Sequence, residues 1–250
     1  MRAVTALVGV WLCLMSVSLH ADTLRVAVAS NFRPAMALLK TSFESNHPAH
    51  VSISYGASGK LVAKAIHGAP YDVVLLADEK RASTLYQRFS NAQATPPFVY
   101  AIGMLALISR SPIATDVSTY LRQECQSSKH SIAIANPRIA PYGEAAIEYL
   151  EQVVEPNVTL NQLLVAENVQ QALLFTDAGG ASVSIVSLSL AKMYERSHQL
   201  YVFPINNDFH RPIKQAGVAL NQRKVTREFV AYLRSPEGQN IIKQAGYNLP

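Results

Sequence analysis

Residues 26–32 read Val-Ala-Val-Ala-Ser-Asn-Phe, an apolar run that ends in two polar residues before an aromatic one. The run is rich in β-branched residues and alanine, which is typical of a parallel strand covered on both faces. Pro34 suits the first turn of a helix, and apolar residues continue at helical spacing up to Phe43. The stretch therefore predicts a buried strand that delivers Ser30 and Asn31 to a helix start.

The helix start behind Ser30 and Asn31 is a candidate anion site. The N–H groups of a first helical turn lack partners within the helix, and the Ser30 hydroxyl and the Asn31 side-chain amide would add donors. Serine and asparagine are also ordinary N-cap residues, which is the more common reason for finding them before a helix. This segment alone does not distinguish a ligand site from simple capping.

Strand-like and helical patterns alternate along almost the whole chain. Further strands are expected at residues 51–55, 71–76, 131–135, 163–165 and 183–186, and a helical pattern follows each of the first four. Such alternation is the signature of an α/β fold with mostly parallel sheets flanked by helices.

Two long extended runs, residues 98–109 and 212–220, interrupt the alternation and are candidates for strands that cross between domains. Gly103, inside the first run, would ease a bend. We expect a discontinuous first lobe of residues 22–102 plus 215–250 and a second lobe of residues 103–214. Clefts between domains are preferred sites for small ligands.

Residues 1–21 have the form of a secretory signal, with Arg2 before an apolar run and a small residue at the expected cleavage site. Removing Arg2 reduces the 22 Lys and Arg to 21 against 17 Asp and Glu, so the mature chain carries a net charge of +4. Mild basicity suits an anionic ligand, and no basic block interleaved with aromatics indicates nucleic acid. Only Cys125 remains after cleavage, which leaves no intramolecular disulfide.

Three later segments also place donors at predicted helix starts. Ser58 follows Gly56-Ala57, Tyr142 follows two prolines, and Val169 follows the potential cap Asn168. Each alone is most simply a capping motif. Two donor segments from each predicted lobe, facing one cleft, would together indicate an anion site.

These segments carry a resemblance to a known family. The quoted motifs are VASNF at 28–32, YGASGKL at 55–61, GAPYDV at 68–73, ANPRIAPYG at 135–143 and AENVQQA at 166–172. In this order they resemble the periplasmic molybdate-binding proteins of ABC transporters over essentially the whole mature chain. The resemblance implies a two-lobed periplasmic binding protein fold that closes on molybdate or tungstate.

The same resemblance implies a function in transport. The protein would be a periplasmic monomer that delivers the oxyanion to a membrane permease of an ABC transporter, with no cofactor and no catalytic residues. The positions that match the family's ligand contacts are Ser30, Asn31, Ser58, Tyr142 and the main chain of Val169. In some members a ligand tyrosine stands where this chain has Ser187, so Ser187 is only a possible contact and its role as a strand-end residue is favoured.

A donor-only pocket agrees with this resemblance. A tetrahedral dianion that is fully deprotonated at neutral pH needs hydrogen-bond donors and no acceptor. Phosphate would profit from a carboxylate, and Glu144 and Glu167 are near enough in sequence to stay open as acceptors. The cations beside the donor segments, expected to be surface charges, are Arg33, Lys60 and Arg138. We further expect the Ser58 hydroxyl to contribute to binding with little effect on stability.

Three alternatives remain open at this point. The ligand could be another tetrahedral oxyanion, sulfate or phosphate, because size selection depends on pocket dimensions. An enzyme on the same scaffold would need a nucleophile, base or metal cluster, whereas Cys125 lies in a polar stretch and the histidines are scattered. A module that signals through a receptor would share the pocket and differ only in its partner.

Overall fold

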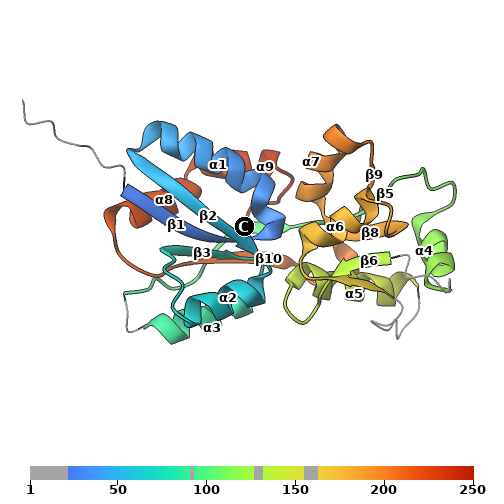
Figure 1. Ribbon diagram of the computed structural model, residues 1–250, viewed down its shortest axis with the longest axis horizontal. Coiled ribbons are helices and arrows are strands. Elements are labelled where there is room, and N and C mark those ends of the chain that lie inside the picture. Colours follow the sequence, from blue (N-terminus) through green and yellow to red (C-terminus); the bar gives the residue numbers. More distant parts are fainter. Residues whose placement is uncertain (1–21, 91–92, 127–131, 155–162) are drawn as a thin grey trace, which may run out of the picture.

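The computed structural model describes residues 22–90, 93–126, 132–154 and 163–250, so the predicted signal segment 1–21 lies outside the described residues. Two five-stranded sheets, each flanked by helices, lie side by side along the long axis of the molecule (Figure 1). This arrangement confirms the predicted two-lobed α/β fold.

The first sheet has the strand order β2-β1-β3-β10-β4. Its strands are β1 (Asp22–Ala29), β2 (Ala49–Gly56), β3 (Val73–Leu76), β4 (Phe98–Gly103) and β10 (Ile213–Ala219). Its helices are α1 (Arg33–Asn46), α2 (Ser58–Ile66), α3 (Glu79–Phe89), α8 (Lys224–Leu233) and α9 (Pro236–Gln244).

The second sheet has the order β7-β6-β8-β5-β9. Its strands are β5 (Leu105–Ser109), β6 (Ile132–Ala135), β7 (Leu164–Ala166), β8 (Val183–Ser187) and β9 (Tyr201–Pro204). Its helices are α4 (Val117–Gln126), α5 (Pro141–Val153), α6 (Val169–Asp177) and α7 (Leu188–His198).

Each sheet is parallel in one half and antiparallel in the other. β1 pairs in parallel with β2 and β3, and β6 pairs in parallel with β7 and β8, as successive βα units require. β10 and β5, which are not part of those units, run antiparallel to both of their neighbours. The alternation in the sequence predicted the parallel halves and did not reveal the antiparallel ones.

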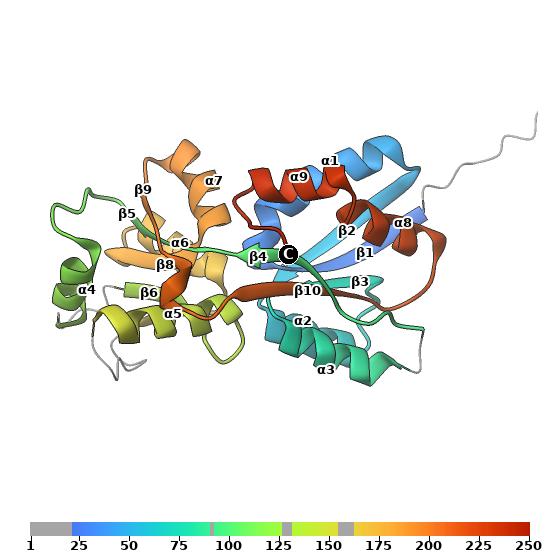
Figure 2. The same cartoon turned by 180° about the vertical axis from the view of Figure 1, so that it is seen from behind.

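The chain passes between the lobes in the middle of the molecule (Figure 2). Met104 alone separates β4 in the first sheet from β5 in the second, and β10 brings the chain back. The C-terminal segment lies against this crossing, because Ile102 and Asn248 exchange main-chain hydrogen bonds of 2.8 and 3.0 Å. The lobe boundaries at 22–102 plus 215–250 and 103–214 stay a prediction.

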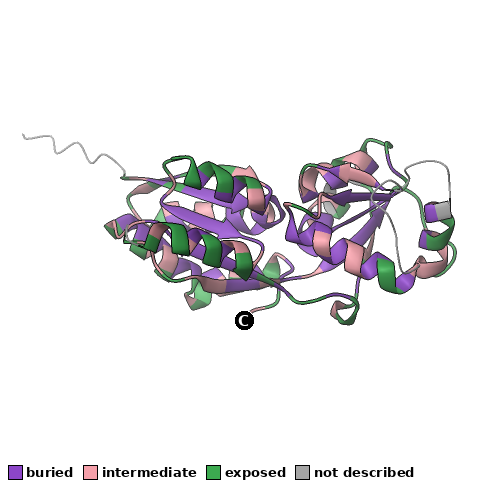
Figure 3. Cartoon of the chain, turned by 90° about the horizontal axis from the view of Figure 1, so that it is seen from below, coloured by how far each residue is buried: buried purple, intermediate pink, exposed green. Residues whose placement is uncertain are grey.

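Most residues in the strands at the middle of the first sheet are buried (Figure 3), and core clusters cover both of its faces. Val26 and Val28 pack on the side of α1 and α8, whereas Ala27 packs on the side of α2 and α3, as the two-residue period of a strand requires. Phe32 extends the first of these cores and makes edge-on contacts with the rings of Tyr100 and Tyr247, at centroid distances of 4.8 and 5.3 Å. This packing therefore fixes the end of β1, next to the turn at Ser30–Phe32 that contacts α6 and α7 of the second lobe.

Candidate functional site

Four helix starts, two from each lobe, surround one small cavity between the lobes. They are the short 3-10 turn at Ser30–Phe32, which leads into α1, and the N-termini of α2, α5 and α6. The lining residues are Ala29, Ser30, Asn31, Gly56, Ala57, Ser58, Ala77, Ala140, Pro141, Tyr142 and Val169. The structure thus brings the five predicted contact residues Ser30, Asn31, Ser58, Tyr142 and Val169 to a single place.

At the first helix start, the structure separates the main chain of Asn31 from its side chain. The Asn31 Nδ2 donates to Gln215 Oε1 at 2.7 Å and to the Tyr247 hydroxyl at 3.2 Å. Both of its side-chain N–H groups are thereby engaged by Gln215 and Tyr247, and a contact between this amide and an anion stays a prediction. What this turn offers the cavity is the Ser30 hydroxyl and the main-chain N–H groups of Ser30 and Asn31.

Ser58 is the first residue of α2 and is almost fully buried. Its Oγ accepts the Ala77 N–H at 3.0 Å, so the hydroxyl keeps its own proton for another acceptor. The next N–H, that of Gly59, donates across the cleft to Ile139 O at 2.9 Å. This helix start therefore presents one hydroxyl to the cavity and also joins the two lobes.

At the start of α5, Tyr142 is the one residue among positions 141–144 whose main-chain N–H has no partner among the described residues. Pro141 has no N–H, and the Gly143 and Glu144 N–H groups donate to Ala140 O at 2.8 and 3.2 Å. A Cβ at position 143 would lie 2.1 Å from Ala135 O, so only glycine lets α5 begin this close to the end of β6. The Tyr142 N–H is consequently free to face the cavity.

Val169 is the first residue of α6 and, like Tyr142 in α5, carries a main-chain N–H in the first helical turn. The side chain of Asn168 caps the helix by accepting the N–H groups of Gln170 and Gln171 at 3.0 and 3.1 Å. This cap confirms the predicted role of Asn168 and leaves the Val169 N–H as the donor of the first turn.

Every residue that lines the cavity is uncharged. Glu167 pairs with Lys60, and Glu144 pairs with Arg81 at 2.8 Å, so neither carboxylate is placed as an acceptor for a bound anion. Arg33 donates to Gln170 Oε1 at 2.7 Å and lies over the ring of Tyr55. The groups on the cavity wall that can stabilise an anion are therefore hydroxyls, N–H groups and the positive ends of helix dipoles, and none is a cationic side chain.

A buried polar network lies beside the cavity. Gln215 Oε1 accepts from the Tyr100 hydroxyl at 3.2 Å as well as from Asn31, and Gln215 Nε2 donates to the Tyr142 hydroxyl at 3.3 Å. Tyr247 donates to Asn31 O at 2.7 Å. Burial raises the pKa of Tyr142 and Tyr100 well above the usual value and that of Tyr247 to about 12, which keeps all three hydroxyls protonated.

Sequence patterns did not identify this network, although one signal was available: Gln215 is a polar residue within the apolar run of β10. Gly103 also has a role that the sequence did not reveal, while the bend expected there stays a prediction. A Cβ at position 103 would lie 2.2 Å from the Tyr142 hydroxyl oxygen, so this glycine makes room for the tyrosine.

Ser187, the possible additional contact, does not line the cavity. Its Oγ caps α7 by accepting the Leu190 N–H at 3.3 Å, which agrees with the favoured role at the end of a strand. Within the described ranges, no group of three or more His, Cys, Asp or Glu side chains is arranged to hold a metal ion.

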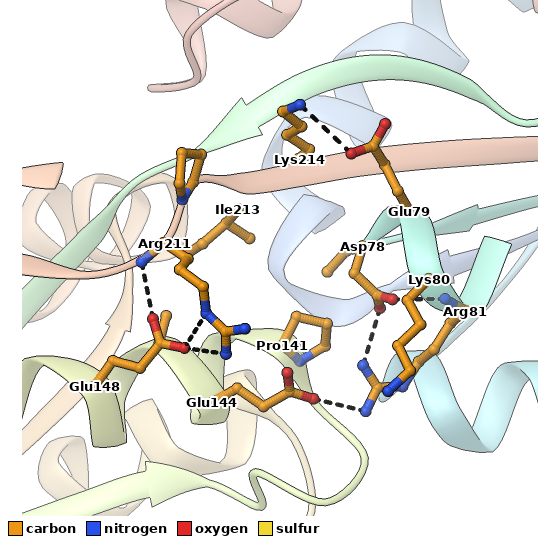
Figure 4. A pocket seen from close by; sticks show the side chains of 13 residues that line it. Asp78, Glu79, Lys80, Arg81, Pro141, Glu144, Glu148, Arg211, Ile213 and Lys214 are labelled. Atoms are coloured by element: carbon orange, nitrogen blue, oxygen red, sulfur yellow. Dashed lines mark hydrogen bonds and ion pairs between the residues drawn. The ribbon is translucent and has the colours of Figure 1, made fainter. Parts of the chain in front are cut away.

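A larger groove of about 370 Å³ opens between the lobes next to the cavity (Figure 4). Arg81 spans it, binding Asp78 on its own lobe at 3.1 Å and Glu144 on α5 at 2.8 Å. Arg211 and Glu148 form a second ion pair on its other side. These charged pairs line the groove, while the uncharged donors line the cavity.

The chain is similar to known solute-binding proteins. The family described as bacterial extracellular solute-binding protein matches residues 24–248. The molybdate-binding protein ModA of Azotobacter vinelandii is 30% identical over 94% of each chain, and that of Rhodobacter capsulatus is 29% identical over 88% of this chain and 86% of the relative. The solved structure of the Azotobacter vinelandii periplasmic molybdate-binding protein is similar with a TM-score of 0.77, 30% identity, and coverage of 91% of this chain and 99% of that one.

Proposed function

The chain belongs to the bacterial extracellular solute-binding protein family, and from this membership we propose that it binds molybdate or tungstate between its two lobes. The proposed contacts are the hydroxyls and main-chain N–H groups of Ser30, Asn31, Ser58, Tyr142 and Val169. Asn31, Tyr142 and Val169 take part through their main chains, and Ser30 and Ser58 also through their hydroxyls.

The observation that carries the proposal is the uncharged cavity at the meeting point of four helix starts. Unpaired N–H groups and the positive ends of helix dipoles stabilise an anion, and the buried surroundings strengthen each hydrogen bond. A dianion without a proton matches a site that offers donors only. An anion that carries a proton, such as hydrogen phosphate, would need a hydrogen-bond acceptor, and no carboxylate lines the cavity.

The biological role follows from the family and from the names of its matched members. We propose that the protein acts in the periplasm as a monomer and passes the oxyanion to the membrane permease of an ABC transporter. It would be a carrier, not an enzyme, and molybdate would be its transported ligand rather than a cofactor. No helix in the part of the chain that the structure describes is long and apolar enough to cross a membrane.

Calorimetric titration of the purified mature protein with molybdate, tungstate, sulfate and phosphate tests the proposal. We expect molybdate and tungstate to bind far more tightly than sulfate. Sulfate is the smaller anion because its bonds to oxygen are shorter, so some donors of the cavity would lie beyond hydrogen-bond reach. Each donor left unsatisfied costs about 1–3 kcal/mol of binding free energy. Phosphate is expected to bind least, because it still carries a proton near neutral pH. Tighter binding of sulfate or phosphate than of molybdate would assign the cavity to a different oxyanion.

A further inference from the structure

Gln215 is a fully buried polar side chain on β10, the strand by which the chain returns to the first lobe. The pairing of β10 with β4 shifts register between Gln215 and Ala216, and such a bulge re-aims the side chains beside it. The Gln215 amide contacts Asn31 of the first lobe and Tyr142 of α5 in the second. It therefore touches two of the proposed anion-binding residues, one from each side of the cavity.

The hydrogen-bond partners fix which way this amide faces. Tyr247 uses its only proton to donate to Asn31 O, so its oxygen must accept from the Asn31 side chain, which therefore presents Nδ2. The same Nδ2 lies 2.7 Å from the Gln215 amide, and that position must then be the acceptor Oε1. Gln215 is left presenting Nε2 to the Tyr142 hydroxyl, as its 3.3 Å contact shows.

Tyr142 is the member of this network that comes from the second lobe. Its hydroxyl reaches past the position of Gly103 into the polar groups of the first lobe, and only 1% of the residue is exposed. The Tyr247 hydroxyl is a second neighbour of the Tyr142 hydroxyl. Separation of the lobes would withdraw the phenol and leave the Gln215 Nε2 without this partner.

We infer that Gln215 is a positioning residue of the anion site. It couples closure of the lobes to ligand binding by holding the Asn31 and Tyr142 segments in fixed positions relative to each other. This inference rests on the proposed function. An apparent affinity falls in proportion to the population of the binding-competent closed state, so loss of this link weakens binding even though Gln215 does not line the cavity.

A double-mutant cycle with molybdate as the probe tests the inference. Gln215→Leu removes the amide, and Tyr142→Phe removes the hydroxyl while keeping the proposed main-chain contact. We expect each single change to weaken molybdate binding about 10-fold, or about 1.4 kcal/mol, and the double variant to lose about 10-fold rather than 100-fold. Gln87→Leu, at an exposed position on α3, is the matched control and should bind within twofold of the wild type.

Gln215→Glu is the second variant, because it keeps the size of the side chain and the acceptor for Asn31. Its carboxylate places a titrating group in contact with Tyr142, so molybdate binding should weaken as pH rises from 5 to 8 while the wild type stays flat. Thermal unfolding without ligand reports whether each variant is folded.

The outcomes separate this inference from the proposed function. Failure of the wild type to bind molybdate would overturn the proposed function. Wild-type binding together with an unaffected Gln215→Leu, or with single effects that multiply in the double variant, would overturn only the role of Gln215. A flat pH profile for folded Gln215→Glu would also contradict it.

Discussion

Replacing Ser58 by alanine tests the hydroxyl that the structure places most clearly at the cavity. The Oγ accepts the Ala77 N–H at 3.0 Å and keeps its proton for the anion. A hydrogen bond to a charged group contributes about 1.5–3 kcal/mol, so Ser58→Ala should weaken molybdate binding by about 10- to 150-fold. Binding should not vanish, because the other donor segments remain.

The same change should also lower the stability of the free protein, contrary to the expectation from sequence of little effect. Removing the Oγ leaves the Ala77 N–H without its partner in a buried place, at a cost of about 1–3 kcal/mol unless water enters the cavity. The sequence could not indicate this second role, because Ser58 and Ala77 meet only when α2 packs beside the end of β3.

Titration calorimetry with molybdate measures the first effect, and urea unfolding without ligand measures the second. Ser54→Ala is the matched control, since Ser54 lies on β2 close to the site in sequence but is exposed. An affinity of Ser58→Ala within twofold of the wild type would refute the assignment of this hydroxyl to the anion. An unchanged free energy of unfolding would contradict the stabilising role of the Ser58–Ala77 hydrogen bond.

Three further outcomes are expected. Gly103→Ala should weaken molybdate binding by about 5- to 150-fold. The added Cβ would lie 2.2 Å from the Tyr142 hydroxyl oxygen, and overpacking of this kind costs about 1–3 kcal/mol. An affinity unchanged by calorimetry would contradict this steric conflict. Molybdate affinity should be flat between pH 6 and 9 and fall only above about pH 10, because burial raises the pKa of Tyr142 and folding then opposes its ionisation; a slope near neutrality would reveal a titrating group in the cavity. Although burial raises the pKa of Glu148, the hydrogen bond from Arg211 lowers it on balance, so the pair stabilises the fold above about pH 4 and this contribution is lost as pH falls through the lowered pKa. Glu148→Gln should therefore be less stable than the wild type at pH 7 and match it near pH 3, and a difference that persists in acid by thermal unfolding would contradict the sign.

Local patterns in the sequence were sufficient to predict the α/β architecture and the segments that bear donors. Strand runs with β-branched residues, Pro34 in a first helical turn, and the Asn168 cap each depend on neighbours within a few residues. Interactions of such short range are encoded in the order of the residues, so reading the chain recovers them.

Only the tertiary structure decided how those segments are used. It pairs the Asn31 amide with Gln215, a residue 184 positions later in the chain, and makes Gly103 the space for the Tyr142 hydroxyl. It also gave the Ser58 hydroxyl a second partner. Hydrogen bonds between such distant residues depend on sheet register, on a bulge in β10 and on the packing of the lobes, and none of these leaves a periodic signal in the sequence.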